Sequence, residues 1–161
     1  MAATVSIRVN TGASAGSQSS TVTGIDLISA DNATNSLTNR QNNPITAGNS
    51  SYEKWLTAYV DAAPDNYVEN FQVWGDGSVQ ATTTLFLGIT QTGVTPTSAD
   101  SSVATNDFTT YTSGNKLTWH STQLTGTGST TDFLVFQLDV GAGADAGNWS
   151  QETVNYSYDE A

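Results

Sequence analysis

The sequence contains no cysteine, so disulfide bonds cannot stabilise the fold and a thiolate metal site is excluded. Long apolar runs are also missing, because no stretch approaches the roughly 18 consecutive apolar residues of a membrane-spanning helix. The N-terminal residues lack the basic and apolar regions of a secretory signal peptide. We therefore expect a protein that is made in a cytoplasm, stays reduced and has no membrane segment.

Positive charge is scarce: four Lys and Arg residues face fifteen Asp and Glu residues, which gives a formal net charge of −11 at pH 7. Arg8, Arg40, Lys54 and Lys116 are also far apart in the sequence. A nucleic-acid-binding surface needs clustered Lys and Arg to displace counterions, and an anionic membrane attracts similar clusters. We therefore expect no direct binding to nucleic acid or to a membrane, and an acidic surface that resists nonspecific association.

Small hydroxyl residues are abundant instead: 26 Thr and 18 Ser make up more than a quarter of the 161 residues. Threonine is β-branched and suits a pleated surface with one face in water. Hydrophobic residues account for 37% and aromatic residues for 9% of the chain, which is low for a compact core but too patterned for disorder. The composition predicts an all-β protein.

Apolar and polar residues alternate in several segments, beginning with Val5, Ile7 and Val9 on one face. The predicted strands are residues 5–9, 21–29, 52–61, 67–74, 80–90, 116–121, 132–140 and 153–160. About eight short strands without a fixed repeat favour one domain over residues 1–161, an antiparallel β-sandwich or jelly roll. The last two strands flank the glycine-rich residues 141–147, and we expect this connection to close a hairpin.

Two polar stretches, residues 31–51 and 92–112, are long for loops in a compact domain. Their expected apolar anchors are Leu37, Ile45, Val94, Val103 and Phe108. The first stretch is either a binding arm or a loop folded against the edge of the sandwich. Both stretches are therefore candidate partner-binding segments.

The third predicted strand carries aliphatic residues on one face and the aromatic residues Trp55 and Tyr59 on the other. We expect a loop or a neighbouring subunit to cover this second face. Trp74 and Trp119 are expected in the core. Trp55 and Trp149 are the candidates for a surface position, where an aromatic ring can anchor a partner or stack on a sugar.

Catalytic signals are weak. His120 is the only histidine, and no Gly-x-Ser-x-Gly motif accompanies it, so an exposed or structural histidine is expected. The nearest carboxylate pairs are Asp61 with Asp65 and Asp139 with Asp145, which turn formation and solvation explain. The first pair could offer oxygen ligands to calcium, but its spacing matches no EF-hand loop. We therefore expect no catalytic residue, metal or cofactor, and no enzyme.

Five segments carry the most distinctive sequence. They are NPITAGNSSYEKW (43–55), VENFQVW (68–74), SVATNDF (102–108), VFQLDVGAG (135–143) and YSYDE (156–160). Together they resemble virion structural proteins of tailed bacteriophages, over about residues 43–160. The resemblance implies a β-rich capsid decoration (cement) protein that binds the outer surface of the major capsid protein shell. It also implies a homotrimer on the capsid exterior, synthesised in the host cytoplasm.

Other functions stay open at this point. A head fibre or a tail or baseplate protein is the first alternative, and a carbohydrate-binding module that uses Trp55 or Trp149 is the second. In a decoration protein, the contact surface would be the N-terminal strand or the two polar stretches, backed by Trp55 and Tyr59. The candidate partner-interface residues are Leu37, Ile45, Trp55, Tyr59, Val103, Phe108 and Trp149.

Overall fold

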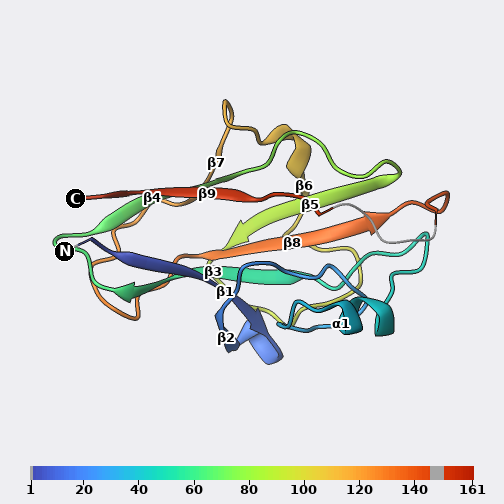
Figure 1. Cartoon of the computed structure of the whole chain (residues 1–161), viewed down its shortest axis with the longest axis horizontal. Coiled ribbons are helices and arrows are strands. Elements are labelled where there is room, and N and C mark those ends of the chain that lie inside the picture. Colours follow the sequence, from blue (N-terminus) through green and yellow to red (C-terminus); the bar gives the residue numbers. More distant parts are fainter. Residues whose placement is uncertain (1, 146–150) are drawn as a thin grey trace.

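The computed structural model describes residues 2–145 and 151–161. It is an antiparallel β-sandwich of a six-stranded sheet, in the order β2-β1-β3-β8-β5-β6, and a three-stranded sheet, in the order β7-β4-β9 (Figure 1). The strands are β1 Thr4–Thr11, β2 Ser17–Thr21, β3 Lys54–Ala62, β4 Val68–Trp74, β5 Thr83–Thr90, β6 Asn106–Asp107, β7 Leu117–His120, β8 Phe133–Val140 and β9 Asn155–Glu160. The predicted all-β sandwich is confirmed. A jelly roll is not confirmed, because the sheets hold six and three strands.

The main core lies between the two sheets and follows the alternation of the strands. Leu56, Ala58 and Val60 of β3 point inward, as do Phe71 and Val73 of β4, and each is at most 6% exposed. Burial of one large apolar side chain contributes about 1.5–3 kcal/mol. The inward faces predicted for these two strands are confirmed.

Three short helices lie in the polar connections of the described chain, and the alternation pattern predicts none of them. The helix α1 (Leu37–Asn42) begins after Ser36, whose side chain accepts a hydrogen bond from Asn39 N at 3.1 Å. The single turns η1 (Ala13–Ala15) and η2 (Phe108–Thr110) are 3-10 helices. The two long polar stretches are therefore partly ordered by local turns.

The predicted second strand is wrong in its position. The strand is β2, which ends at Thr21, and the chain then leaves the sheet. Val22, Ile25 and Leu27 still pack against the main core, but from an irregular segment. The apolar residues of this segment are therefore partly buried without belonging to a strand.

The predicted terminal hairpin is also wrong. β8 pairs with β3 and β5 in the six-stranded sheet, whereas β9 pairs with β4 in the other sheet. The chain therefore passes from one sheet to the other between its last two strands. A glycine-rich connection suits either a hairpin or such a crossover, so long-range pairing decides between them.

Candidate interaction surface

Trp55, a predicted surface residue, is buried with 0% exposure. It belongs to a second cluster, on the outer face of the six-stranded sheet, together with Ala15, Ala104 and Val135. The Phe133 ring meets the indole edge-on, with the ring centroids 5.4 Å apart. The expectation of an exposed Trp55 is therefore wrong, because the chain's own loops cover this face.

A buried carboxylate fastens the covering segment above Trp55. Glu53 is 2% exposed, and its Oε2 accepts hydrogen bonds from Trp55 Nε1 at 3.0 Å and from Thr97 N at 3.3 Å. The Glu53 backbone N also donates to Thr97 O at 2.9 Å. A carboxylate removed from water requires such donors, so Glu53 both holds and depends on the segment.

A buried amide fastens the next part of the same segment. Gln137 Nε2 donates to Ala99 O at 2.8 Å, and Gln137 Oε1 accepts from Ser101 N at 2.8 Å. The backbone then lies so close to β5 that a Cβ at Gly88 would collide with the Val103 carbonyl. The second polar stretch is therefore packed on the sheet here and does not project as an arm.

The two predicted interface residues of this stretch differ in burial. Phe108 is 2% exposed, and its ring meets Phe136 edge-on with centroids 5.5 Å apart. Val103 is half-buried and packs against the cluster around Trp55. Phe108 belongs to the main core and offers no surface to a partner, whereas Val103 is only partly buried beside Trp55, so its predicted interface role stays a prediction.

The first polar stretch is attached by a buried ammonium group. Lys54 is 1% exposed, and its Nζ donates to Ala30 O at 2.9 Å and to Asn32 O at 2.8 Å. Burial lowers the pKa of Lys54 from 10.5 to about 8, while the charges of Asp31 and Asp26 oppose this change. Lys54 thus holds the start of the first polar stretch against the sandwich, although burial removes water from its own charged group.

The helix in this stretch is fastened as well. Arg40 Nη1 lies 2.7 Å from Oδ1 of the buried Asp26, which precedes the helix in the chain. Leu37 is 52% exposed on α1, and Ile45 is half-buried. Of the predicted interface residues that the structure describes, Leu37 has the most open side chain.

The last two predicted interface residues differ in what the structure shows. Tyr59 is half-buried beneath Arg8, whose guanidinium carbon lies 3.3 Å from the ring centroid. The same guanidinium forms an ion pair with Asp61 at 2.7 Å, so the ring is capped by the chain's own residues. Trp149 lies outside the described residues.

His120 forms a contact between the two sheets. It is 9% exposed, and its Nδ1 lies 3.1 Å from Asp132 Oδ2 and 3.3 Å from Asp132 N. The neighbouring Trp119 donates from Nε1 to Asp132 O at 2.8 Å. These contacts tie β7 to the start of β8, which favours a structural histidine. Within residues 2–145 and 151–161, no group of three or more His, Asp and Glu side chains is placed to hold a metal ion.

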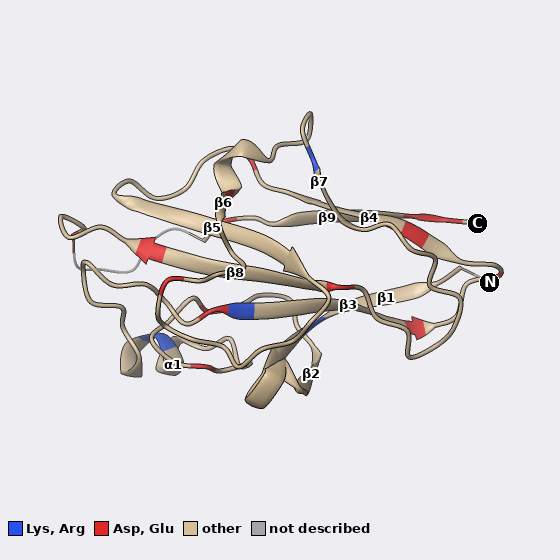
Figure 2. Cartoon of the chain, turned by 180° about the vertical axis from the view of Figure 1, so that it is seen from behind, with Lys and Arg blue, Asp and Glu red and all other residues tan. Residues whose placement is uncertain are grey.

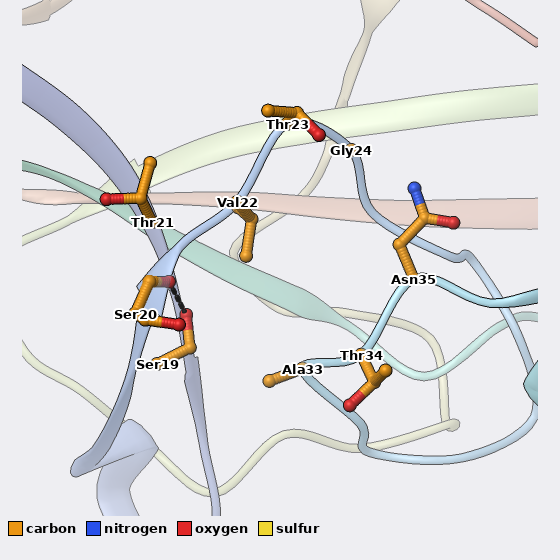
Figure 3. A pocket seen from close by; sticks show the side chains of 9 residues that line it. All are labelled: Ser19, Ser20, Thr21, Val22, Thr23, Gly24, Ala33, Thr34 and Asn35. Atoms are coloured by element: carbon orange, nitrogen blue, oxygen red, sulfur yellow. Dashed lines mark hydrogen bonds between the residues drawn. The ribbon is translucent and has the colours of Figure 1, made fainter.

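A shallow hollow of about 310 Å³ lies beside the end of β2 (Figure 3). It is lined by residues 19–24 and 33–35, which carry hydroxyl, amide and small apolar groups. Ser19 Oγ is engaged with Ser20 O at 2.6 Å, as the dashed line shows. Because no ionisable side chain lines this hollow, it offers no group for acid–base catalysis.

Trp74 lies on the outward face of the three-stranded sheet, so its predicted core position is wrong. It alternates with the buried Phe71 and Val73, and Lys116 Nζ lies 4.2 Å from the centroid of its ring. The other side chains that the strand register places on this face are Glu69, Gln72, Thr118, Asn155, Ser157 and Asp159. This face combines one partly exposed aromatic ring with amide, hydroxyl and carboxylate groups.

The few cations of the chain are engaged by its own groups. Arg8 and Arg40 form the ion pairs described above, Lys54 is buried, and Lys116 lies over an indole ring. With fifteen acidic residues against these four, the groups that face solvent are predominantly negative. In Figure 2 the ribbon is coloured for acidic residues along the last residues of β9 and near the start of β4, at the end of the molecule where β9 terminates.

Two of these carboxylates face each other across strands. Glu69 of β4 is the register partner of Asp159 of β9. Asn70 Nδ2 donates to Asp159 Oδ2 at 2.9 Å, but within the described chain no Lys or Arg lies at ion-pair distance from either carboxylate. Like charges directly opposite each other destabilise a strand pair. This pair is therefore an unfavourable contact within the fold.

Sequence reasoning missed that β9 is an edge strand. It pairs with β4 on one side, and it ends the order of the three-stranded sheet. Alternation reports which residues share a face but not whether a second neighbour exists. The acidic residues Asp159 and Glu160 are the one available signal, because charges often occur on exposed sheet edges.

The chain matches no family model, no curated protein and no solved structure. Of the helices in the described residues, none is long and apolar enough to span a bilayer.

Proposed function

We propose that this chain is a virion structural protein of a tailed bacteriophage, a capsid decoration protein that binds the outer surface of the major capsid protein shell. The resemblance of five segments over about residues 43–160 supports this assignment. The structural observation that carries it is the attachment of both long polar stretches to the sandwich by Glu53, Gln137 and Lys54. Such a firmly covered sandwich suits a building part that presents a fixed surface.

The proposal includes a homotrimer on the capsid exterior, made in the host cytoplasm. A formal charge of −11 supports an exterior position, since strong negative charge limits sticking between particles. Association with neighbours would also stabilise a chain in which only 37% of residues are hydrophobic, because binding to the folded state favours that state.

The structure changes which surface we propose for shell contact. The N-terminal strand β1 has β2 on one side and β3 on the other, so neither of its edges is open. The two polar stretches are largely occupied with their own sandwich. We therefore place the shell contact on the outward face of the three-stranded sheet, around Trp74 and Gln72.

Shell binding can be tested directly with capsids of the encoding phage that lack this chain. Purified protein is added, and cryo-microscopy locates the additional density. We expect sandwich-shaped density on the outer shell, and lower occupancy for Trp74→Ala than for the control Ser20→Ala on β2. An undecorated shell at saturating protein concentration would contradict the proposal.

A head fibre or a tail or baseplate protein is the first alternative within the same class. Antibody labelling of intact particles separates the locations, because a tail position cannot be confused with occupancy of the shell. Label confined to the tail would replace the decoration assignment with this one.

A carbohydrate-binding module is the second alternative, and one observation favours it. Trp74 shares its face with Gln72, Thr118 and Asn155, and an aromatic ring beside amide and hydroxyl groups suits a sugar. Trp55 no longer supports this alternative, because its ring is buried. Binding on a glycan array that Trp74→Ala abolishes, without affinity for shells, would favour this function over decoration.

A further inference from the structure

The strand β9 offers an open edge for pairing. It has six residues, and β4 is its neighbour on one side while no other described strand pairs with its second side. The strand at the opposite border of this sheet, β7, has four residues. Unpaired backbone N–H and C=O groups on such an edge are a template for an added strand.

The side chains along β9 change in character from one end to the other. Val154, just before the strand, is 38% exposed, and Tyr156 is 41% exposed. Asp159 and Glu160 at the far end are exposed carboxylates. A segment that pairs with β9 would therefore meet apolar surface at one end and negative charge at the other.

The negative charge extends onto the neighbouring strand. Glu69 faces Asp159, and no Lys or Arg among the described residues compensates this pair. Burial raises the pKa of Tyr158, and the nearby Glu160 charge raises it further. Glu160 Oε1 accepts a hydrogen bond from Ala3 N at 2.6 Å, and Asn70 donates to Asp159, but both donors are uncharged. A partner with Lys or Arg would therefore complement the negative charge at this end of the sheet.

A second copy of the chain is a poor source of that countercharge. Each copy carries a formal charge of −11, so a second copy placed at this acidic edge would add negative charge there; the proposed trimer would use another surface. The cations of a copy are also engaged in its own ion pairs, core and indole contact. The complementary occupant is instead a segment with Lys or Arg of its own.

We propose that β9 is a docking edge for an extended, Lys- or Arg-bearing segment of a partner protein. This segment adds to the three-stranded sheet as a fourth strand, next to β9. In antiparallel register, basic side chains of that segment lie opposite Glu160 and Asp159. An apolar side chain lies opposite Tyr156. Backbone pairing supplies affinity, and the charges select the partner and its register.

This inference goes beyond the proposed function, because it names the strand used and the chemistry of the partner segment. It does not require the partner to be a capsid protein. Occupancy on shells tests the proposed function, whereas a synthetic peptide tests the edge. The two can therefore fail separately.

The test uses the full chain and the peptide Arg-Lys-Val-Thr-Val-Thr-Val, whose antiparallel register sets Arg opposite Glu160 and Val opposite Tyr156. Fluorescence anisotropy measures binding at low salt, and hydrogen exchange measures protection of the β9 amides. We expect saturable binding that slows exchange in β9 and weakens as salt rises. No binding at about 1 mM peptide, equivalent to roughly 4 kcal/mol, would overturn the proposal.

Two altered peptides separate strand pairing from simple charge attraction. Glu-Glu-Val-Thr-Val-Thr-Val reverses the charge, and we expect it not to bind. A basic peptide with N-methyl groups on the amides that face β9 keeps the charge but cannot pair, and we expect its affinity to be lost. Equal binding of the N-methylated and parent peptides would overturn the strand-addition proposal.

Variants of the chain then test the acidic pair. Glu69→Gln with Asp159→Asn keeps the side-chain shapes and should weaken the basic peptide by up to about fivefold. Glu69→Lys with Asp159→Lys should reverse the preference toward the acidic peptide. The control Ser20→Lys adds a positive charge on β2, an edge strand of the other sheet, and should leave peptide binding nearly unchanged.

Self-association is read from the same protein without peptide. Sedimentation that shows a dimer whose formation protects β9 would identify a second copy as the occupant and would contradict a cationic partner. The control Ser20→Lys provides a second check. If it weakens peptide binding as strongly as the Glu69 and Asp159 variants do, the effect follows net charge alone, and the proposed docking edge is contradicted.

Discussion

The outward faces of the two sheets differ in how the chain covers them. On the six-stranded sheet, Trp55 is buried under loops that Glu53 and Gln137 hold in place. On the three-stranded sheet, Trp74 lies outward with Lys116 beside its ring. Both tryptophans lie in strands where apolar and polar residues alternate, and each is adjacent to an inward-facing apolar residue. The local alternation pattern therefore does not decide whether a tryptophan on an outward face is buried, because the loops that cover it come from elsewhere in the chain.

The covering loops also explain why the two long polar stretches are not free arms. Their polar composition suits solvent, but a few buried side chains of the sheet form hydrogen bonds with the backbone of these stretches. Glu53 accepts from the backbone at Thr97, and Lys54 donates to the backbone at Ala30 and Asn32. Buried backbone groups need partners of this kind. Polar length alone is thus a poor guide to a binding arm.

The largest expected effect comes from truncating the two tryptophans. Trp55→Ala should lower the free energy of unfolding by about 3–5 kcal/mol, because it leaves a cavity under the covering loops. Trp74→Ala, the matched change on the other sheet, should cost much less. Urea unfolding followed by circular dichroism measures both. Equal losses would break the contrast between the covered and the open face.

The second effect concerns the pH dependence that Lys54 adds. Its pKa is about 8 in the fold and 10.5 as the ordinary value, so between these pH values the unfolded chain binds more protons than the folded chain. Stability from this group therefore rises as pH increases from 8 toward 10.5, by about 2–3 kcal/mol in total.

The measurement compares unfolding of the wild type and Lys54→Met at several pH values in that window. As pH rises, the free energy of unfolding of the wild type should increase relative to that of Lys54→Met. A constant difference would show that Lys54 keeps its ordinary proton affinity and that its burial carries no such cost.

The third effect isolates the polar fastening of the covering loop. Glu53→Leu leaves Trp55 Nε1 and Thr97 N without their acceptor, which should cost about 1–3 kcal/mol. Hydrogen exchange should speed up around Thr97. The control Glu69→Gln changes a carboxylate on the open sheet and should not destabilise the fold; similar losses in both variants would contradict a special role for Glu53.

The smallest effect is a gain of stability on the open sheet. Asp159→Asn removes one of two like charges that face each other, so it should stabilise the fold by about 0.2–1 kcal/mol at low salt. The gain should shrink as salt increases, because ions screen exposed charges. Thermal unfolding at two salt concentrations measures it. A loss of stability at low salt would indicate that the hydrogen bond from Asn70 outweighs the repulsion between Asp159 and Glu69.

Several features of the fold could be predicted from sequence because they follow from local alternation. The inward residues of β3 and β4 are such a case, since the side-chain period of a strand is two whatever lies opposite. The displaced second strand was missed because Val22, Ile25 and Leu27 pack against the core from an irregular segment, although Val22 N still donates to Ile7 O at 2.9 Å. Apolar spacing reports burial there but not hydrogen bonding.

The candidate surface was harder to predict. Trp55 and Phe108 were expected to be accessible, yet both are buried, while Trp74 was expected in the core and lies outward. These positions depend on contacts between residues far apart in the chain, such as those of Glu53 with Thr97. No short segment contains that information.

The sequence by itself determined the all-β class, the strong negative charge and the inward faces of the main strands, because composition and alternation act locally. Tertiary structure decided which sheet each strand joined, which outward face was covered and that β9 became an edge. The physical reason is that a strand of period two satisfies many pairings equally well. Buried polar groups such as Glu53, Lys54 and Gln137 select one of them only when distant segments meet.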